Sequence, residues 1–344
     1  MRIQPDRQEA AEDQAAVIGL LRTVLSSVGS YFGIDDPVAQ TFAAPEPDVL
    51  RYPGLVAAAY EAQRARQAAR KGLDERRHLM TRVQAIVEQA RSSARRAQDC
   101  ACPTWRVDLA PPEPHLRASL ARAVAQVPKP PDRLEALAKI AVADWQDEQR
   151  EAFCVASCLL ASIWPQMLAE MTAVVRQVAL LRGYGIDGFT DFTAHGTVFV
   201  NSRRLGPGAG GLPADAHMAE ALVHEATHNR CNAAAVSRPF LAGDDTSPES
   251  LVMTPLRSDP RPLAGLFQQL VVLVRCSLLY DRLVECATGD AHALRARRER
   301  LVGQARQGLA TAQRHSGKLT EHGRAIVAEA ADMLNREASA APAH

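Results

Sequence analysis

The stretch Ala219-Glu-Ala-Leu-Val-His-Glu-Ala-Thr-His228 places two histidines four residues apart in a run of helix-favouring residues, a His-Glu-x-x-His (HExxH) motif. On a helix, His224 and His228 lie on one face with Cβ atoms about 5–6 Å apart, so both imidazoles can bind one metal ion. Glu225 is placed to act as a base or to orient a ligand. We therefore predict a metal-binding helix over residues 215–235. The alternative is a surface helix that carries two histidines by coincidence.

The composition narrows the class of protein. A chain of 344 residues can form one or two domains, and a net charge of +1 provides no overall field to attract nucleic acid or a membrane. No apolar run reaches about 18 residues, and the first residues lack the apolar stretch of a signal peptide. The seven scattered cysteines fit a reducing compartment. We expect a cytoplasmic enzyme with no nucleic-acid or membrane partner.

Two close cysteine pairs, Cys100 with Cys102 and Cys154 with Cys158, are weaker candidates for metal binding. Neither pair has His or Cys partners at the spacing of a zinc site. Cys158 lies among apolar residues, and we expect it in the hydrophobic core.

Residue types in the first half predict helices. Alanine is abundant, and aromatic residues make up only 5% of the chain. Helical patterns cover residues 13–28, 55–97 and 132–181, and Pro165 is expected to kink or break the last of them.

From Gly183 the pattern changes to turns and a short strand at residues 197–200, which precedes the HExxH helix. The expected fold is therefore mainly α, a helical metalloenzyme with a small β element before that helix. We expect two regions: residues 1–182, helical and available for peptide docking or as a scaffold, and residues 183–344, which bind the metal and carry the catalytic site.

A catalytic metal needs a third protein ligand and open positions. A later helix, beginning at Pro262, is apolar on every side near its middle, and we predict that it is buried. It carries Glu285, an arrangement that resembles zinc peptidases whose third ligand is a glutamate on a later helix. Glu285 is our predicted third ligand, and Asp281, one turn earlier on the same face, is an equal rival on geometry.

Three arginines are candidates for binding a carboxylate-bearing cofactor. Arg257 and Arg261 lie in a short polar segment, and Arg275 interrupts the apolar helix. Any of them could hold a carboxylate through two parallel hydrogen bonds. The alternative for each is an ordinary internal ion pair. Gln268 lies one heptad before Arg275 on the same face and joins the candidate set.

Three blocks of sequence carry a resemblance to a known family. They are the stretch that ends in His224-Glu225-x-x-His228, then Thr254-Pro-Leu-Arg-Ser-Asp-Pro-Arg-Pro-Leu-Ala-Gly-Leu-Phe-Gln268, and then Ser316-Gly-Lys-Leu-Thr-Glu-His-Gly-Arg324. In this order and spacing they resemble the HExxH-motif peptide-modification family, which occurs alone or fused to radical-SAM maturases in gene clusters for ribosomally synthesised, modified peptides (RiPPs). A Trp often stands in that family where this chain has Leu256. Residues 1–180 carry no such motif.

The resemblance implies an Fe(II)/2-oxoglutarate oxygenase that hydroxylates the β-carbon of a residue in a precursor peptide. It implies that His224 and His228 bind iron and that the Arg-Ser-Asp-Pro-Arg-Pro block lies near the site. The precursor peptide is the implied partner, and a radical-SAM maturase of the same pathway is a further candidate. Two imidazoles and a carboxylate would leave three metal positions for the keto acid and oxygen, and Glu225 would then orient neighbouring groups.

Two other functions fit the same residues. A zinc peptidase would use Glu225 as the general base that activates metal-bound water. A metal-stabilised peptide-binding protein would keep the ion for structure alone.

Overall fold

The computed structural model of this chain describes residues 1–31, 47–67, 73–100, 102–127, 137, 139–243, 251–253 and 259–340. The longer helices are α1 (Arg7–Tyr31), α4 (Pro53–Gln67), α5 (Leu73–Gln98), α6 (Pro114–Gln126), α8 (Asp147–Ile163), α9 (Pro165–Val174), α10 (Ala214–Ser237), α11 (Leu263–Cys286), α12 (His292–Arg314) and α13 (Glu321–Ala340), with a short α3 (Pro47–Leu50). The strands are β1 (Asp108–Ala110), β2 (Ala141–Ala143), β3 (Gln177–Arg182), β4 (Gly188–Phe189), β5 (Thr197–Asn201), β6 (Leu251–Val252) and β7 (Arg261–Pro262). The prediction of a mainly helical chain is confirmed.

Pro165 breaks the helical run as predicted. Helix α8 ends at Ile163, and Pro165 begins α9, where its missing N–H costs no helical hydrogen bond. Helices α8 and α9 confirm the helical prediction for residues 147–174, but the prediction is wrong for β2 and for residues 177–181 of β3. Strand β3 is a short apolar run buried on both faces, and periodicity alone cannot distinguish such a run from a buried helix.

The β element is larger than the single strand expected. Five strands form one sheet in the order β1-β3-β5-β4, with β2 paired antiparallel to β3. Strands β1, β3 and β5 are parallel, and β4 runs antiparallel to β5. Val178 and Leu180 of β3 join the main core, whereas Ala179 and Leu181 join a smaller core beneath α6. Helices therefore cover both faces of the sheet.

The boundary expected between residues 182 and 183 falls inside this sheet. Strands β1 and β3 precede it, and β5, which pairs with β3 over residues 177–181, follows it. Residues 183–344 consequently share a sheet with the region before them. The peptide-docking role suggested for residues 1–182 stays a prediction.

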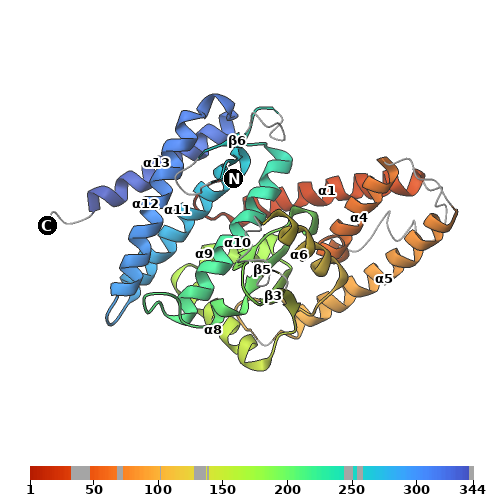
Figure 1. The fold of residues 1–344 in the computed structure, drawn as a ribbon, viewed down its shortest axis with the longest axis horizontal. Coiled ribbons are helices and arrows are strands. Elements are labelled where there is room, and N and C mark those ends of the chain that lie inside the picture. Colours follow the sequence, from red (N-terminus) through yellow and green to blue (C-terminus); the bar gives the residue numbers. More distant parts are fainter. Residues whose placement is uncertain are drawn as a thin grey trace.

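Helix α10 occupies the centre of the molecule (Figure 1). It packs against α11 on one side, against β5 on another, and against α1, α8 and α9. The prediction that the HExxH helix packs on the helix beginning near Pro262 is confirmed. Helices α12 and α13 complete the C-terminal layer by packing on α11.

A buried ion network joins these helices. Arg230 of α10 and Arg275 of α11 are both fully buried. Glu170 of α9 lies between them: its carboxylate is 2.5 Å from Arg275 Nη1 and 3.6 Å from Arg230 Nε. Arg230 also pairs with Asp13 of α1 at 2.5 Å, and Arg275 donates to the carbonyl oxygen of Ile3. The network thus ties α1, α9, α10 and α11 together through direct ion pairs and hydrogen bonds.

Helix α11 is the only described helix long and apolar enough to span a membrane, and 72% of its most apolar window is buried inside the fold. Such burial is typical of a core helix.

Replacement of Glu170 by Gln tests the network. The variant removes the charge that Arg230 and Arg275 share, and breaking a buried ion pair from one side typically costs about 3–5 kcal/mol. We expect the free energy of unfolding in urea to fall by that amount. Glu148→Gln, at an exposed position on α8, is the control and should change stability by less than about 0.5 kcal/mol. Equal stabilities for the two variants would refute the role given to Glu170.

Candidate metal-binding and peptide-binding site

The HExxH histidines lie in the middle of α10, which spans Ala214–Ser237 and so confirms the predicted helix. Both rings are half-buried, and their centroids are 5.2 Å apart. Asn229, the residue after His228, is fully buried and hydrogen bonds to the backbone of Gly196 and Thr197 at the start of β5. This contact fixes the rotation of α10 against the sheet, and with it the direction of the histidines.

The histidines face an open pocket of about 1130 Å³. Four parts of the chain line it: α10, the start of α11 with the segment before it, α6, and the chain around β4. The lining residues are Ser119, Arg122, Ala123, Gln126, Val127, residues 185–193, His224, Glu225, His228, Asn232, Asp259, Arg261, Gln268 and Gln269. The pocket therefore brings together five of the predicted site residues: His224, Glu225, His228, Arg261 and Gln268.

Gln268 of α11 connects the two helices at the level of the motif. Its Oε1 lies 2.8 Å from His228 Nδ1, and its Nε2 donates to Asn232 Oδ1 at 2.9 Å. In the tautomer that carries the proton on Nδ1, His228 donates to Gln268 and keeps the Nε2 lone pair for a metal ion. Asn232, one turn after His228 on the same face, holds the amide of Gln268 in the orientation this requires.

Both histidines are held neutral. Burial, followed by the proximity of His228, lowers the pKa of His224 to about 3, and burial lowers the pKa of His228. A metal ion binds the neutral form of imidazole. At neutral pH both rings are therefore in the protonation state that metal binding requires.

Glu225 lies beneath strand β4. Thr190 Oγ1 donates to Glu225 Oε2 at 2.8 Å and also lies 3.1 Å from the Glu225 carbonyl oxygen. Burial raises the pKa of Glu225 to about 7, against the opposing effects of Thr190 and Arg204. The side chain is only 7% exposed. Its carboxyl group is thus fixed in place, close to the histidines, and easily protonated near neutral pH.

Strand β4 forms an edge beside the histidines. Among the described strands only β5 pairs with it, and residues 185–193, which include β4, line the pocket. An unpaired strand edge offers backbone donors and acceptors to an extended peptide. The pocket thus combines two imidazoles with the last strand of the sheet.

Two arginines line the pocket, and each pairs with an aspartate there. Arg261 Nε lies 2.8 Å from Asp259 Oδ2, and both side chains are partly exposed, at 33% and 42%. Arg122 of α6 pairs with Asp191 at 2.6 Å. Arg261 is therefore in a position to exchange its aspartate for the carboxylate of a ligand.

Glu285 does not lie near the histidines, and the prediction of this residue as the third metal ligand is wrong. It is exposed in the last turn of α11, about 25 Å beyond Gln268 at a rise of 1.5 Å per residue. Asp281, the rival candidate, pairs with Arg298 of α12. The sequence indicated the correct helix, but only its first turns reach the metal motif.

Arg275 does not line the pocket either, so its predicted role as a cofactor-binding residue is wrong. Its guanidinium is fully buried in the ion network with Glu170. The alternative of an internal ion pair was correct for this residue, although the partner comes from α9. Arg257 lies outside the described residues, and its role stays a prediction.

Several pocket residues escaped the sequence analysis as candidates, among them Asn232, Gly188 and Thr190. Asn232 could have been found, because it follows His228 by one helical turn. Gly188 and Thr190 could not, since their contact with Glu225 depends on the sheet. Among the described residues, no group of three or more His, Cys, Asp or Glu side chains is arranged to hold a metal ion.

Comparison of the sequence with protein-family models and with characterised proteins finds no match.

Gly188→Ala tests the fit of β4 over Glu225. A Cβ at this position would lie 2.8 Å from Glu225 Oε1 and 3.0 Å from the Phe199 carbonyl oxygen. We expect a loss of about 1–3 kcal/mol in unfolding free energy, as in other overpacked sites. In Gly265→Ala, on α11, the new Cβ meets nothing within 4 Å, and this control should be neutral or stabilising by up to about 1 kcal/mol. A Gly188→Ala protein as stable as the control would mean that β4 does not pack tightly against Glu225.

Proposed function

We propose that this protein is an iron- and 2-oxoglutarate-dependent oxygenase that hydroxylates the β-carbon of a residue in a ribosomally synthesised precursor peptide. The observation that carries the proposal is the shared pocket of His224, His228 and Arg261 beside the free edge of β4. The family resemblance implies that the Arg-Ser-Asp-Pro-Arg-Pro block lies near the metal. In support, Asp259 and Arg261 of that block line the same pocket.

The donor set suits iron in part. Two neutral imidazoles on one wall of an open pocket are ligands that both iron and zinc accept. No described carboxylate is arranged with the two histidines as a third ligand, so the keto acid and water would complete the coordination. Iron(II), with 2-oxoglutarate and dioxygen as co-substrates, would supply the chemistry that inserts one oxygen atom into a C–H bond, while the keto acid is oxidised to succinate and carbon dioxide. His224 and His228 would hold the ion, and Gln268 would keep His228 in the required tautomer.

Arg261 is the proposed anchor for the distal carboxylate of 2-oxoglutarate. Its guanidinium lies in the pocket with Asp259 as its partner. A carboxylate of the keto acid can replace that partner through two parallel hydrogen bonds. Arg122, the other arginine of the pocket, pairs with Asp191, whose pKa is lowered because hydrogen bonds from Arg122 and Thr193 outweigh its burial. Arg122 is therefore held more firmly by its own aspartate than Arg261 is, and it is less free to bind the keto acid.

The free edge of β4 is the proposed docking place for the peptide. An extended segment can add to this edge as a further strand, which would bring its side chains over the histidines. We assign the protein to the cytoplasm, where precursor peptides are made, and take a radical-SAM maturase of the same pathway as a candidate partner.

A zinc peptidase is the second candidate, and one observation favours it: Glu225 has a pKa raised to about 7, next to the histidines. Such a carboxyl group suits proton transfer from metal-bound water. Against this reading, Glu225 is pinned by Thr190 and almost fully buried. In addition, neither carboxylate of α11 can serve as the glutamate ligand that this class of peptidase places on a later helix.

Metal content tests the histidine pair. Protein purified without oxygen should contain one equivalent of metal, measured by inductively coupled plasma mass spectrometry. His224→Ala or His228→Ala should lose the metal, because one imidazole cannot hold the ion alone. Glu285→Ala is the matched control and should keep the full equivalent. Full metal content in either histidine variant would show the motif to be incidental.

Arg261→Ala tests the proposed anchor. Loss of the guanidinium should raise the 2-oxoglutarate concentration needed for half-maximal turnover by about 10- to 100-fold, since a charged hydrogen bond contributes roughly 1.5–3 kcal/mol. Arg122→Ala should leave this concentration nearly unchanged. If Arg122→Ala raised this concentration and Arg261→Ala did not, Arg122 would be the residue that binds the distal carboxylate.

Glu225→Gln separates the two functions. In an oxygenase the variant should still yield peptide heavier by one oxygen atom, with a modest loss of rate, when it is incubated with a candidate precursor peptide, Fe(II), 2-oxoglutarate and oxygen. In a peptidase the loss of the base should cost about 10²–10⁴-fold. Cleavage of the peptide by the zinc-loaded wild-type protein, and no cleavage by Glu225→Gln, would refute the oxygenase.

A further inference from the structure

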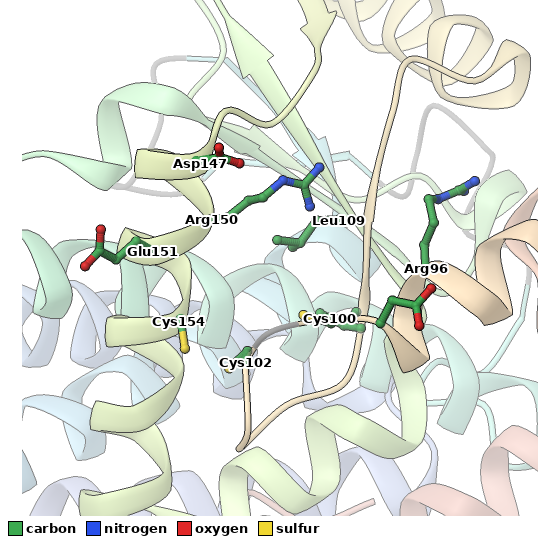
Figure 2. A pocket seen from close by; sticks show the side chains of 10 residues that line it. Arg96, Cys100, Cys102, Leu109, Asp147, Arg150, Glu151 and Cys154 are labelled. Carbon is green, nitrogen blue, oxygen red and sulfur yellow. The ribbon is translucent and has the colours of Figure 1, made fainter.

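A second cavity, of about 540 Å³, lies between the end of α5, the loop that follows it, and α8 (Figure 2). It shares no lining residue with the histidine pocket. Its walls are formed by Arg96, Asp99, Cys100, Cys102, Val107, Leu109, Asp147, Arg150, Glu151 and Cys154. Three of these residues carry thiols, and they come from two separate segments of the chain.

The thiols gather around Cys154. Figure 2 shows Cys154 projecting from α8 toward the loop that carries Cys102. Cys102 and Cys154 line the same cavity, Cys102 from the loop and Cys154 from α8. Thr104 Oγ1 lies 3.3 Å from Cys102 Sγ and 3.8 Å from Cys158 Sγ, which closes the cluster on its other side.

Geometry selects one pair within this cluster. Cys154 and Cys158 are four residues apart on one helix, where Cβ atoms lie about 5–6 Å apart. A disulfide requires Cβ atoms about 3.5–4.5 Å apart, so these two are poorly placed to pair. The thiol of Cys100 points to the Trp105 carbonyl oxygen. The Thr104 hydroxyl contacts the thiols of both Cys102 and Cys158, and Cys158 does not line the cavity. Cys102 and Cys154, which face the cavity from different segments, remain.

We propose that Cys102 and Cys154 are a peroxide-sensitive dithiol that closes to a disulfide between the loop after α5 and helix α8. The Cys102 thiolate attacks hydrogen peroxide, which gives a sulfenic acid on Cys102 and releases hydroxide. The Cys154 thiol then attacks the Cys102 sulfur, the S–S bond forms, and the sulfenic oxygen leaves as water. Two electrons pass from the two thiols to the peroxide, and a thiol reductant reverses the reaction.

The surroundings of the two thiols fit these separate roles. Burial opposes ionisation of Cys102, but hydrogen bonds from Thr104 Oγ1 and from the backbone amides of Trp105 and Thr104 outweigh it and lower the pKa of the thiol. Burial and the two neighbouring thiols raise the pKa of Cys154 to about 12. Cys102 is therefore the thiol prepared to react first, because the thiolate is the nucleophile.

The test uses the full chain with Cys100→Ser and Cys158→Ser. Trypsin leaves Cys100 with Cys102, and Cys154 with Cys158, in the peptides 97–106 and 151–176, so this double variant makes the assignment of sulfurs unambiguous. After brief treatment with hydrogen peroxide and blocking of free thiols, mass spectrometry should find these two peptides joined, and dithiothreitol should separate them. Exposed Cys286 serves as the internal control and should remain blocked as a free thiol.

A third substitution, Cys154→Ser, should abolish the joined peptides and leave a sulfenic acid on Cys102 that dimedone traps. The oxidised protein should also melt at a higher temperature than the reduced one, since the bond closes a loop of about fifty residues. If the thiol-blocking reagent modified both Cys102 and Cys154 completely after peroxide treatment, both thiols would have stayed reduced, and the proposal would be overturned. A disulfide from Cys158 to either Cys102 or Cys154, in the protein with all its native cysteines, would also overturn it.

Discussion

The structure depends on one buried carboxylate, Glu170, which lies between the guanidiniums of Arg230 and Arg275. Arg230 follows His228 closely on α10, and Arg275 lies two turns after Gln268 on α11. If α10 slid or rotated against α11, at least one buried arginine would lose its partner, at a cost of several kcal/mol. The network therefore keeps the motif helix in register with α11 and preserves the contact between His228 and Gln268 that orients the imidazole.

The sheet holds the same helix from the other side. Asn229 is bound to the start of β5, and Glu225 lies beneath Gly188 and Thr190 around β4. Since the sheet ends at β4, the histidines lie next to an unpaired strand edge. One short segment, His224 to Arg230, thus carries both proposed metal ligands together with contacts to the sheet and to the neighbouring helices. The proposed metal motif therefore lies on a helix that is held from both sides.

The sequence pattern predicted those features of the fold that depend on neighbouring residues. The helix around His224, the break at Pro165 and the packing of the Pro262 helix on the motif all follow from periodicity and capping chemistry. The sheet did not follow, because β3 reads equally well as buried helix, and parallel pairing joins residues far apart in sequence. Residue type and the choice of helix pointed to Glu285 as the third metal ligand. Which turn of that helix lies beside the histidines is set by tertiary contacts, which the sequence pattern does not contain. Arg275 was misassigned for the same reason, since its partner Glu170 lies on another helix.

The central claim is that His224 and His228 bind iron in a pocket that also accepts 2-oxoglutarate. The most direct measurement is the visible absorption spectrum of the protein titrated with Fe(II) and then with 2-oxoglutarate in the absence of oxygen. The account predicts a charge-transfer band that develops with one equivalent of each, weakens in Arg261→Ala at the same keto-acid concentration, and is absent in His228→Ala. A protein that retains zinc in preference to iron, and whose spectrum 2-oxoglutarate leaves unchanged, would contradict it.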